Sequence, residues 1–536
     1  MHLNARLLSV AIVAALAFPA VAQAASPDGS PAARRALGLI DGHSAAVRRA
    51  DADAFVARDI VVDADGTEHA RFARTWRGLP VIGGDLVVHS RNGQFRGASL
   101  TLDSRARPDL RGGISADRAI VEAGVAFGTG FDGVPTARKV VYARNATPVL
   151  AWEVLMKGTR ADQTPTEMHF FVDARSGRIL DRYDDIKTAK GKPGGGGGST
   201  TCTTAASGIG QSLFSGDVAL ATSRCSDGSY QMRDGTRGGG QTSDMANRTN
   251  GMGTVLADAD NNWGDNTTSN RATVAADAHH GVAETWDYFK AIHGRNGIAN
   301  DGKGALSRVH YGRNYANAFW SDSCFCMTFG DGNSSIYPLV NVDVAGHEMS
   351  HGVTSRSADL TYSGESGGLN EATSDIFGTM VEYYANNSND TPDYMIGEEL
   401  YISNPNGTRA LRYMFKPILD GASPDCYTGN IGSLDVHYSS GVGNHAFFLM
   451  AEGAAVPAGF NLSASQLVCN GNTAAGGIGR DAASKVWYRA LTVYMTSNTS
   501  YAGARAATLQ AASDLYGSGS SQYNGVASAW SAVGVN

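Results

Sequence analysis

The pattern of apolar and polar residues changes along the chain. Short runs of alternating character, bounded by turn residues, predict half-buried strands in the first part, at 59–66, 79–84, 85–89, 152–155 and 169–173. One segment there, 115–127, has helical spacing, with Ser115 in the N-cap position. After a further strand-rich stretch, helical spacing predicts helices near 277–293, 340–356, 369–386, 439–452, 480–494, 502–516 and 525–533. We therefore predict an α+β protein whose last part is mainly helical.

The N-terminus has the layout of a signal peptide. Arg6 precedes an apolar run at 7–19, and Ala22 and Ala24 supply the small residues of a cleavage site. A membrane anchor is the alternative, but the run is shorter than the ~20 residues of a spanning helix. We expect residues 1–24 to be removed on export, which would leave a secreted, extracellular protein with no membrane-bound part.

A glycine-rich linker at 191–200 divides the rest of the chain. Residues 25–199 carry 25 Lys and Arg against 21 Asp and Glu, whereas the residues from 200 onward carry 18 against 30. All six cysteines lie in the second part. A basic pro-segment that covers an acidic enzyme would give this asymmetry, and so would two ordinary domains of different charge.

Composition narrows the class of function. The 536 residues are 42% hydrophobic and 18% charged, as in a folded globular protein. The 66 glycines show no G-X-Y period, which excludes a collagen-like fibre. Because the net charge is only −7, we expect no nucleic-acid partner.

The segment His347-Glu348-Met349-Ser350-His351 lies within the predicted helix at 340–356. Histidines four residues apart project from one helix face, so both imidazoles can bind one zinc ion. Glu348 is placed to take a proton from a zinc-activated water. A motif this short also arises by chance, so it needs support from the rest of the chain.

Glu371 is the candidate for the third protein ligand that a catalytic zinc site requires. It follows His351 by 20 residues in the next helical segment, and Asp375 lies one turn further on the same face. A carboxylate at Asp375 can accept from a zinc-bound histidine and fix its tautomer. Alone, both residues would be read as solvated helix charges; with the first motif at this spacing, we expect ligation by Glu371.

Together these motifs resemble those of the thermolysin-like metallopeptidases. The second motif reads Asn370-Glu371-Ala372-Thr373-Ser374-Asp375. Metzincins, another group of zinc peptidases, require Gly and His where this chain has Thr354 and Ser357. The chain is therefore identified, by resemblance, as a member of the thermolysin-like family.

The resemblance implies an α+β fold with a two-lobed catalytic domain. Its β-rich N-terminal lobe would span 201–355 and end in the zinc helix, and its mainly helical C-terminal lobe would span 356–536. Residues 25–190 would form a pro-region of two small α+β modules, at about 50–100 and 115–185. That pro-region would act as an intramolecular chaperone and inhibitor.

By the same resemblance, further residues complete the catalytic site. His437, oriented by Asp435, and Tyr362 would stabilise the oxyanion of the tetrahedral intermediate. Asn317 and Ala318 would belong to an edge strand that pairs with the substrate backbone. Arg412 would hold the substrate carbonyl. The pocket for the residue after the scissile bond would be lined by Leu339, Val344 and Leu411. Branched apolar walls of this kind prefer bulky apolar residues with broad specificity.

Structural calcium is a further implication of the resemblance. The matching positions are Asp343, Glu382, Asp393, Met395 and Glu398. Oxygen-rich clusters of this kind suit Ca2+. Met395 stands where the family has a glutamate and could bind only through its carbonyl, so we expect at least one ion and leave a paired second ion open. Acidic surface side chains that bind nothing are the alternative.

Six cysteines in an exported protein allow 15 sets of three disulfides. Proximity in sequence favours Cys202–Cys225 and Cys426–Cys469. The remaining Cys324 and Cys326 could form a tight bridge or stay as free thiols.

We therefore expect a secreted, monomeric zinc endopeptidase, made as a zymogen, that cleaves proteins and peptides before bulky apolar residues. One alternative is another zinc peptidase such as an aminopeptidase, whose Gly-x-Met-Glu-Asn signature this chain lacks. The other is a secreted binding protein that keeps the scaffold, against which the presence of Glu348, His437 and Tyr362 argues.

Overall fold

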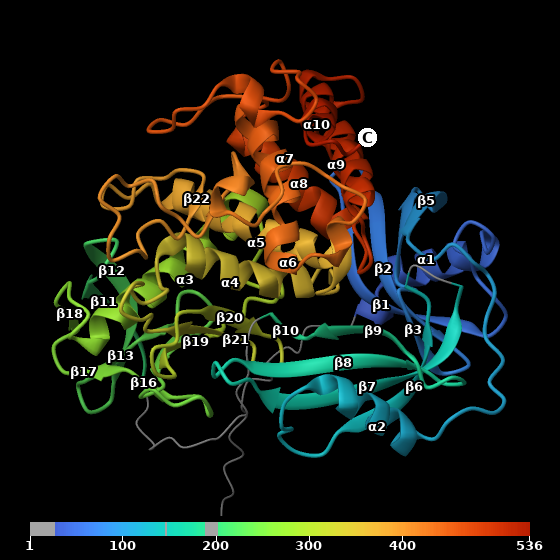
Figure 1. Cartoon of the computed structure of the whole chain (residues 1–536), viewed down its shortest axis with the longest axis horizontal. Helices are drawn as coiled ribbons and strands as arrows, with labels where there is room; N and C mark the ends of the chain where they lie inside the picture. The colour runs from blue at the N-terminus through green and yellow to red at the C-terminus, as the bar shows by residue number, and fades with distance from the viewer. Residues whose placement is uncertain (1–26, 145–146, 188–201) are drawn as a thin grey trace, which may run out of the picture.

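The computed structural model describes residues 27–144, 147–187 and 202–536. The predicted signal peptide at 1–24 and the linker at 191–200 therefore lie outside the described residues. Figure 1 shows a pro-region sheet on one side of the molecule, a strand-rich lobe on the other, and a group of helices above and between them.

The pro-region is built on one nine-stranded sheet. Its strands are β1 (Asp53–Val62), β2 (Thr67–Trp76), β3 (Leu79–Ile82), β4 (Leu86–Arg91), β5 (Gln94–Leu100), β6 (Thr136–Tyr142), β7 (Val149–Thr159), β8 (Pro165–Asp173) and β9 (Ile179–Asp184). The expected hairpin is present, with Leu155 of β7 opposite His169 of β8. The two halves of the sheet are joined because β3 runs parallel to β6, with Val81 opposite Val141.

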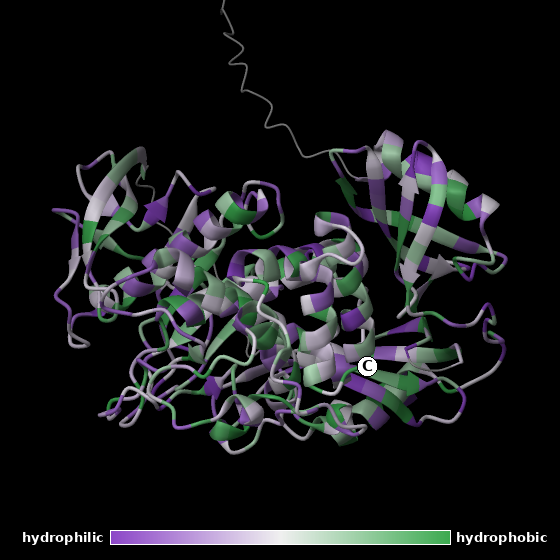
Figure 2. Cartoon of the chain, turned by 90° about the horizontal axis from the view of Figure 1, so that it is seen from above, coloured by the Kyte–Doolittle hydropathy of each residue, from purple (hydrophilic) through white to green (hydrophobic). Residues whose placement is uncertain are grey.

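One helix covers each half of this sheet. α2 (Ala116–Phe127) is the predicted one, and the hydroxyl of Ser115 accepts from the Arg118 amide at 3.2 Å. α1 (Pro31–Gly42) was not predicted; its buried face is mostly alanine, with Ile40, and packs against Phe72. Small side chains give a weak periodic signal, which explains the miss. Figure 2 shows hydrophobic and hydrophilic residues interspersed along the strands of both halves.

The strand-rich lobe of the catalytic part contains two sheets. The five-stranded sheet consists of β11 (Cys202–Gln211), β12 (Asp217–Cys225), β13 (Tyr230–Gln231), β17 (Ala257–Asp258) and β18 (Asn262–Gly264). The seven-stranded sheet consists of β14 (Arg233–Asp234), β15 (Gly240–Asp244), β16 (Thr254–Val255), β19 (Leu306–Tyr311), β20 (Ala318–Ser321), β21 (Cys326–Gly330) and β10 (Ile186–Lys187). The disulfides are Cys202–Cys225, Cys324–Cys326 and Cys426–Cys469. The two pairings favoured by sequence proximity are confirmed, and the third pair forms a bridge.

The strand β10 precedes the linker in sequence but pairs with the catalytic part. Ile186 lies opposite Ser321 and Lys187 opposite Trp320, in antiparallel register. It is thus the edge strand beside β20, and Figure 1 shows it between β9 and β20. The pro-region therefore occupies the strand edge at which we expected substrate to bind.

The rest of the catalytic part is mainly helical. Its helices are α3 (Arg271–His293), α4 (Val342–Ser355), α5 (Gly364–Ala385), α6 (Val436–Ser439), α7 (Gly441–Glu452), α8 (Arg480–Arg489), α9 (Tyr501–Tyr516) and α10 (Ser521–Ala532). A π-helical turn (Ala490–Tyr494) follows α8, and β22 (Met395–Ile396) pairs with β23 (Arg412–Tyr413). Short 3-10 turns lie at Pro27–Gly29, Pro417–Asp420, Ile431–Ser433 and Ala464–Leu467. Among the described residues, none of the helices combines the length and apolar character needed to cross a membrane.

Two glycines let α4 and α5 approach each other closely. A Cβ atom on Gly378 of α5 would lie 2.4 Å from the carbonyl oxygen of Asp343 on α4. A Cβ atom on Gly346 of α4 would lie 3.0 Å from the Gly378 Cα atom. Since His347 follows Gly346 directly, this contact sets the distance between its helix and the helix that carries Glu371.

We predict that Gly378→Ala lowers the free energy of unfolding of the full chain by about 1–3 kcal/mol, because the added methyl group meets backbone that cannot rotate away. Chemical denaturation followed by tryptophan fluorescence measures the change. Gly429→Ala is the matched control, since a Cβ atom there meets nothing within 4 Å. Equal denaturation midpoints for the two variants would contradict the packing argument.

Candidate metal centre and catalytic site

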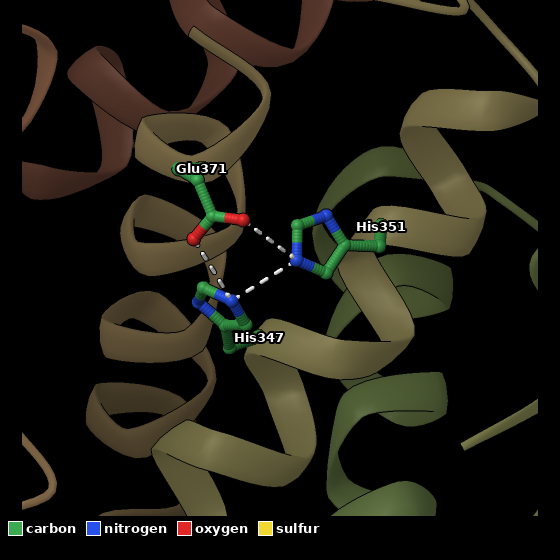
Figure 3. Close-up of side chains that lie close together, drawn as sticks. All are labelled: His347, His351 and Glu371. Carbon is green, nitrogen blue, oxygen red and sulfur yellow. Dashed lines mark hydrogen bonds and ion pairs between the residues drawn. The ribbon is translucent and has the colours of Figure 1, made fainter. Parts of the chain in front are cut away.

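Three predicted ligands converge between α4 and α5. The Nε2 atoms of His347 and His351 are 3.0 Å apart. The Glu371 carboxylate faces both, with Oε2 3.5 Å from His347 Nε2 and Oε1 3.4 Å from His351 Nε2. Figure 3 shows the two imidazoles and the carboxylate pointing toward one another from the two helices. All three residues are buried.

Hydrogen bonds behind the rings fix their orientation. His347 Nδ1 lies 2.8 Å from Asp375 Oδ1, and His351 Nδ1 lies 2.8 Å from Asn370 Oδ1 and 3.0 Å from Ser374 Oγ. A carboxylate and an amide oxygen accept hydrogen bonds, so Nδ1 carries the proton in each ring. Both Nε2 lone pairs therefore point into the space between the helices, as zinc ligation requires.

The charge states of the three groups also suit a metal. Burial lowers the pKa of His351 to about 3, which keeps its ring neutral. Burial raises the pKa of Glu371, but His437, His351 and His347 outweigh it and lower that pKa to about 2. Glu371 Oε2 has no hydrogen-bond partner in the described part of the chain. Two neutral imidazoles and one ionised carboxylate with a free oxygen form a donor set that fits Zn2+.

Asp375 links the site to two further elements. Its carboxylate accepts from Arg412 at 2.7 and 2.6 Å and from Asn444 Nδ2 at 2.8 Å. Burial raises the pKa of Asp375, but Arg412 and His347 more than offset it and lower the pKa. Arg412, predicted to hold a substrate carbonyl, is thus engaged with Asp375 here. Sequence reasoning missed Asn444, because a buried asparagine in a helix has no distinctive spacing.

Glu348 lies beside the ligands, one residue after His347 on α4. It is buried, and its Oε2 atom has no hydrogen-bond partner among the residues described. Burial and the neighbouring Glu371 carboxylate raise the pKa of Glu348 well above its ordinary value. Glu348 is thus a buried carboxyl group close enough to Glu371 to sense its charge, and its role as a base stays a prediction.

His437 and Tyr362 lie beside the Glu371 carboxylate. The Tyr362 hydroxyl donates to Glu371 and lies 3.2 Å from His437 Nε2. His437 Nδ1 is 2.7 Å from Asp435 Oδ1, and the same carboxylate caps α6 through the His437 amide. Partial burial disfavours the charged ring, but Glu371 and Asp435 outweigh it and raise the pKa of His437.

The other predicted substrate residues lie at the start of β20 and in one apolar cluster. Ala318 begins β20, and the Asn317 side chain accepts from its amide at 3.0 Å. Leu339 and Val344 belong to one apolar cluster, against which Leu411 packs, and Leu411 immediately precedes Arg412. The three predicted pocket residues therefore share one apolar cluster, and their role as a pocket stays a prediction.

A second group of carboxylates lies near the end of α5. Glu382, Asp390 and Glu398 are buried and place an oxygen each within 4.8 Å of one another. Among the described residues, both carboxylate oxygens of Glu382 and both of Glu398 have no hydrogen-bond partner. Burial and Glu399 raise the pKa of Asp390 to about 8. Such a set favours a hard cation such as Ca2+.

Asp390 was not among the predicted calcium residues. Asp393 lies outside this group of three and accepts from the Met395 amide at 2.6 Å, while Asp343 accepts from the Gly397 amide at 2.7 Å. Asp390 sits in a polar turn after the helix, where spacing gives no face to align. Only its position in the sequence, shortly after the end of the helix that carries Glu382, could have pointed to it.

Known domain families match three parts of the chain. Residues 53–102 match the fungalysin/thermolysin propeptide motif, 207–355 the thermolysin metallopeptidase catalytic domain, and 358–535 the thermolysin metallopeptidase alpha-helical domain. The precursor of protealysin from Serratia proteamaculans is a similar solved structure. It has 28% sequence identity and a TM-score of 0.43, covering 55% of this chain and 87% of that one.

Two relatives align over most of the chain. The transglutaminase-activating metalloprotease of Streptomyces mobaraensis is 47% identical over 487 residues, which are 90% of this chain but only 61% of that protein. The thermolysin of Alicyclobacillus acidocaldarius subsp. acidocaldarius is 36% identical over 493 residues, covering 87% of this chain and 83% of that protein. With its propeptide motif, its two peptidase domains and a three-residue group that fits zinc, this chain belongs to the thermolysin family of zinc metallopeptidases.

Proposed function

We propose that this chain is the zymogen of a secreted, monomeric endopeptidase that hydrolyses protein and peptide bonds before bulky apolar residues. The observation that carries the proposal is one arrangement: the His347, His351 and Glu371 group, with a buried base on one side and two hydrogen-bond donors on the other. The apolar N-terminal segment supports export.

Zinc held by His347, His351 and Glu371 would supply Lewis acidity, which acidifies a water molecule and polarises a carbonyl. Glu348 accepts the proton of the attacking water and later delivers it to the leaving amine. The direction of the pKa shift suits both roles, since a carboxyl group with a raised pKa holds the proton more readily before it returns it.

His437 and Tyr362 stabilise the oxyanion that forms at the scissile carbonyl. Their polar atoms are 3.2 Å apart, so both can donate to one oxygen. Asp435 accepts from Nδ1 of His437 and, together with Glu371, raises the pKa of the ring, so the doubly protonated form that also donates from Nε2 is favoured. Asp375 and Arg412 act as positioning residues, because they orient His347 from behind.

The pocket explains the preferred substrates. Leu339, Val344 and Leu411 present branched apolar walls beside the centre, so a bulky apolar side chain gains from burial there. Because one methylene changes such a pocket by only about 1–3 kcal/mol, cleavage would be broad among Leu, Ile, Val and Phe.

The pro-region inhibits by occupying the substrate edge. β10 pairs with β20, and Gln163 of the hairpin between β7 and β8 binds both backbone groups of Arg313, just before that strand. A second contact area joins Arg489 to Asp63, at 2.7 Å. A substrate that pairs with β20 must displace β10, so activation requires removal of the pro-region.

We predict that Glu348→Gln lowers kcat on an N- and C-blocked peptide with Leu or Phe after the scissile bond by on the order of 10³-fold, since the amide cannot take a proton. The precursors are cut in the linker by an added serine protease, which is then inhibited, and products are read by mass spectrometry. Glu284→Gln, on α3, is the matched control and keeps activity. A zinc chelator should stop the wild-type reaction.

Four results would count against this proposal. A wild-type rate in Glu348→Gln would exclude Glu348 as the base. Cleavage that the chelator does not affect would exclude a role for zinc. Cleavage only of peptides with a free amine would favour an aminopeptidase. No cleavage by processed, zinc-loaded protein would favour a binding protein on the same scaffold.

We predict that Asp375→Asn weakens zinc binding about 10–100-fold, because the His347 ring loses the carboxylate that fixes its tautomer. Competition with a chromogenic chelator measures the dissociation constant. Asp287→Asn, which alters a surface partner of Arg237, should bind zinc as the wild type does. Equal affinities of Asp375→Asn and wild type would show that the hydrogen bond does not tune the site.

We propose that Glu382, Asp390 and Glu398 bind a structural Ca2+. Removal of calcium, with zinc kept in excess, should speed thermal inactivation. An ion that binds only the folded state stabilises that state, by about 2.7 kcal/mol when its concentration is a hundred times Kd. Asp390→Asn should raise the calcium concentration needed for protection about tenfold, and Asp393→Asn much less. The reverse order would restore Asp393 as the ligand.

A further inference from the structure

Lys187 of β10 inserts its side chain into the catalytic part. The residue is only 4% exposed. Its Nζ atom lies 2.7 Å from Asp322 Oδ2 and 2.8 Å from Ser355 Oγ. The nearest pro-region carboxylate, Asp185, is 3.9 Å away, so the two shorter contacts come from the catalytic part.

The pocket that receives this lysine is part of the catalytic framework. Asp322 directly follows β20, on the turn closed by the Cys324–Cys326 disulfide. Ser355 is the last residue of α4, the helix that carries both zinc histidines, and its hydroxyl contacts Asp322 Oδ2 at 2.7 Å. The walls therefore remain in place when the pro-region leaves.

Charge favours a cation in this pocket. Burial lowers the pKa of Lys187, but Asp322, Asp185 and Asp359 more than offset it and raise the pKa. Burial raises the pKa of Asp322, but Lys187 and Arg356 lower it to about 2. Arg356, bound to Oδ1 at 2.8 Å, stays with Asp322 after Lys187 has gone. Among the described residues, Asp322 Oδ2 then keeps only the Ser355 hydroxyl as a close partner.

The strand register places this pocket along the substrate path. β10 runs antiparallel to β20, so its chain passes Ser321 and then Trp320, in the direction of Ala318. A substrate that pairs in the same polarity also passes Trp320 before it reaches Ala318. With substrate bound at Asn317 and Ala318, as proposed, a side chain at the position of Lys187 lies on the amino-terminal side of the bond that is cut.

We propose that Asp322 and Ser355 form a subsite for a lysine or arginine side chain of the substrate, on the amino-terminal side of the scissile bond. This proposal rests on the proposed endopeptidase function and adds a second, charge-based element to its specificity. Lys187 of the pro-region occupies the subsite in the zymogen. Substrates would then be selected by an apolar residue after the bond and a basic residue before it.

The test compares blocked peptides that are identical except at one position. Each has Phe after the scissile bond, and carries Lys, Arg, Gln or Glu at the first, second or third position before it. For the processed wild-type enzyme, kcat/KM should be about fivefold higher for Lys than for Gln at one of these positions, and lowest for Glu. Raising the salt concentration should reduce the ratio.

Asp322→Asn should bring the Lys-to-Gln ratio close to one, because the charge is lost while the shape is kept. Asp481→Asn, a matched change at an exposed position on α8, should leave the ratio as in the wild type. Ser355→Ala removes one of the two close contacts and should reduce the ratio in part, which provides a second variant if Asp322→Asn does not fold.

Equal cleavage of the Lys and Gln peptides by the wild type would overturn the subsite while leaving the endopeptidase intact. A ratio that persists in Asp322→Asn would also overturn it. Cleavage of none of the peptides would contradict the proposed function, and the subsite with it.

Discussion

The close approach of α4 and α5 is the contact on which the site depends. His347 and His351 come from one helix and Glu371 from the other, so the helix separation fixes whether three donor atoms can meet. Glycine at 346 and 378 permits that separation, because a methyl group at Gly378 would lie 2.4 Å from backbone. The next layer, Asp375 with Arg412 and Asn444, ties β23 and α7 to the same pair of helices. The metal ligands are thus part of the core of the helical lobe.

The sequence predicts those helices and strands in which apolar residues recur at a regular spacing. Eight helical segments and the hairpin of β7 and β8 follow from periodicity, and the zinc ligands follow from spacing along two helices. The α1 helix was not predicted, because its buried face is mostly alanine and gives a weak hydrophobic pattern. Asp390 was not predicted as a calcium ligand, because a residue in a turn belongs to no regular pattern of spacing. Its position close to Glu382 is a property of the folded chain.

The pro-region interface is less simple than the charge difference between the two parts suggests. Basic residues of the pro-region do reach the catalytic part, as Lys187 does at Asp322. One ion pair has the opposite sense, since Asp63 of the pro-region binds Arg489, and Asp85 of the pro-region accepts a hydrogen bond from the Ser497 amide. A two-residue strand such as β10 has no pattern of its own, and a lysine is normally read as exposed. Neither the strand nor the burial of Lys187 could be predicted from the sequence.

Under the proposed function, the pairing of β10 with β20 would make the pro-region a tethered competitive inhibitor. While the chain is intact, the effective local concentration of the blocking strand is set by the covalent connection, on the order of millimolar for short flexible linkers. Latency before the cut is then independent of how much protein is present. After the cut, the same contacts become bimolecular, so dilution alone shifts the equilibrium toward open enzyme. A crowded compartment would keep the pro-region bound, and release into a large volume would complete activation.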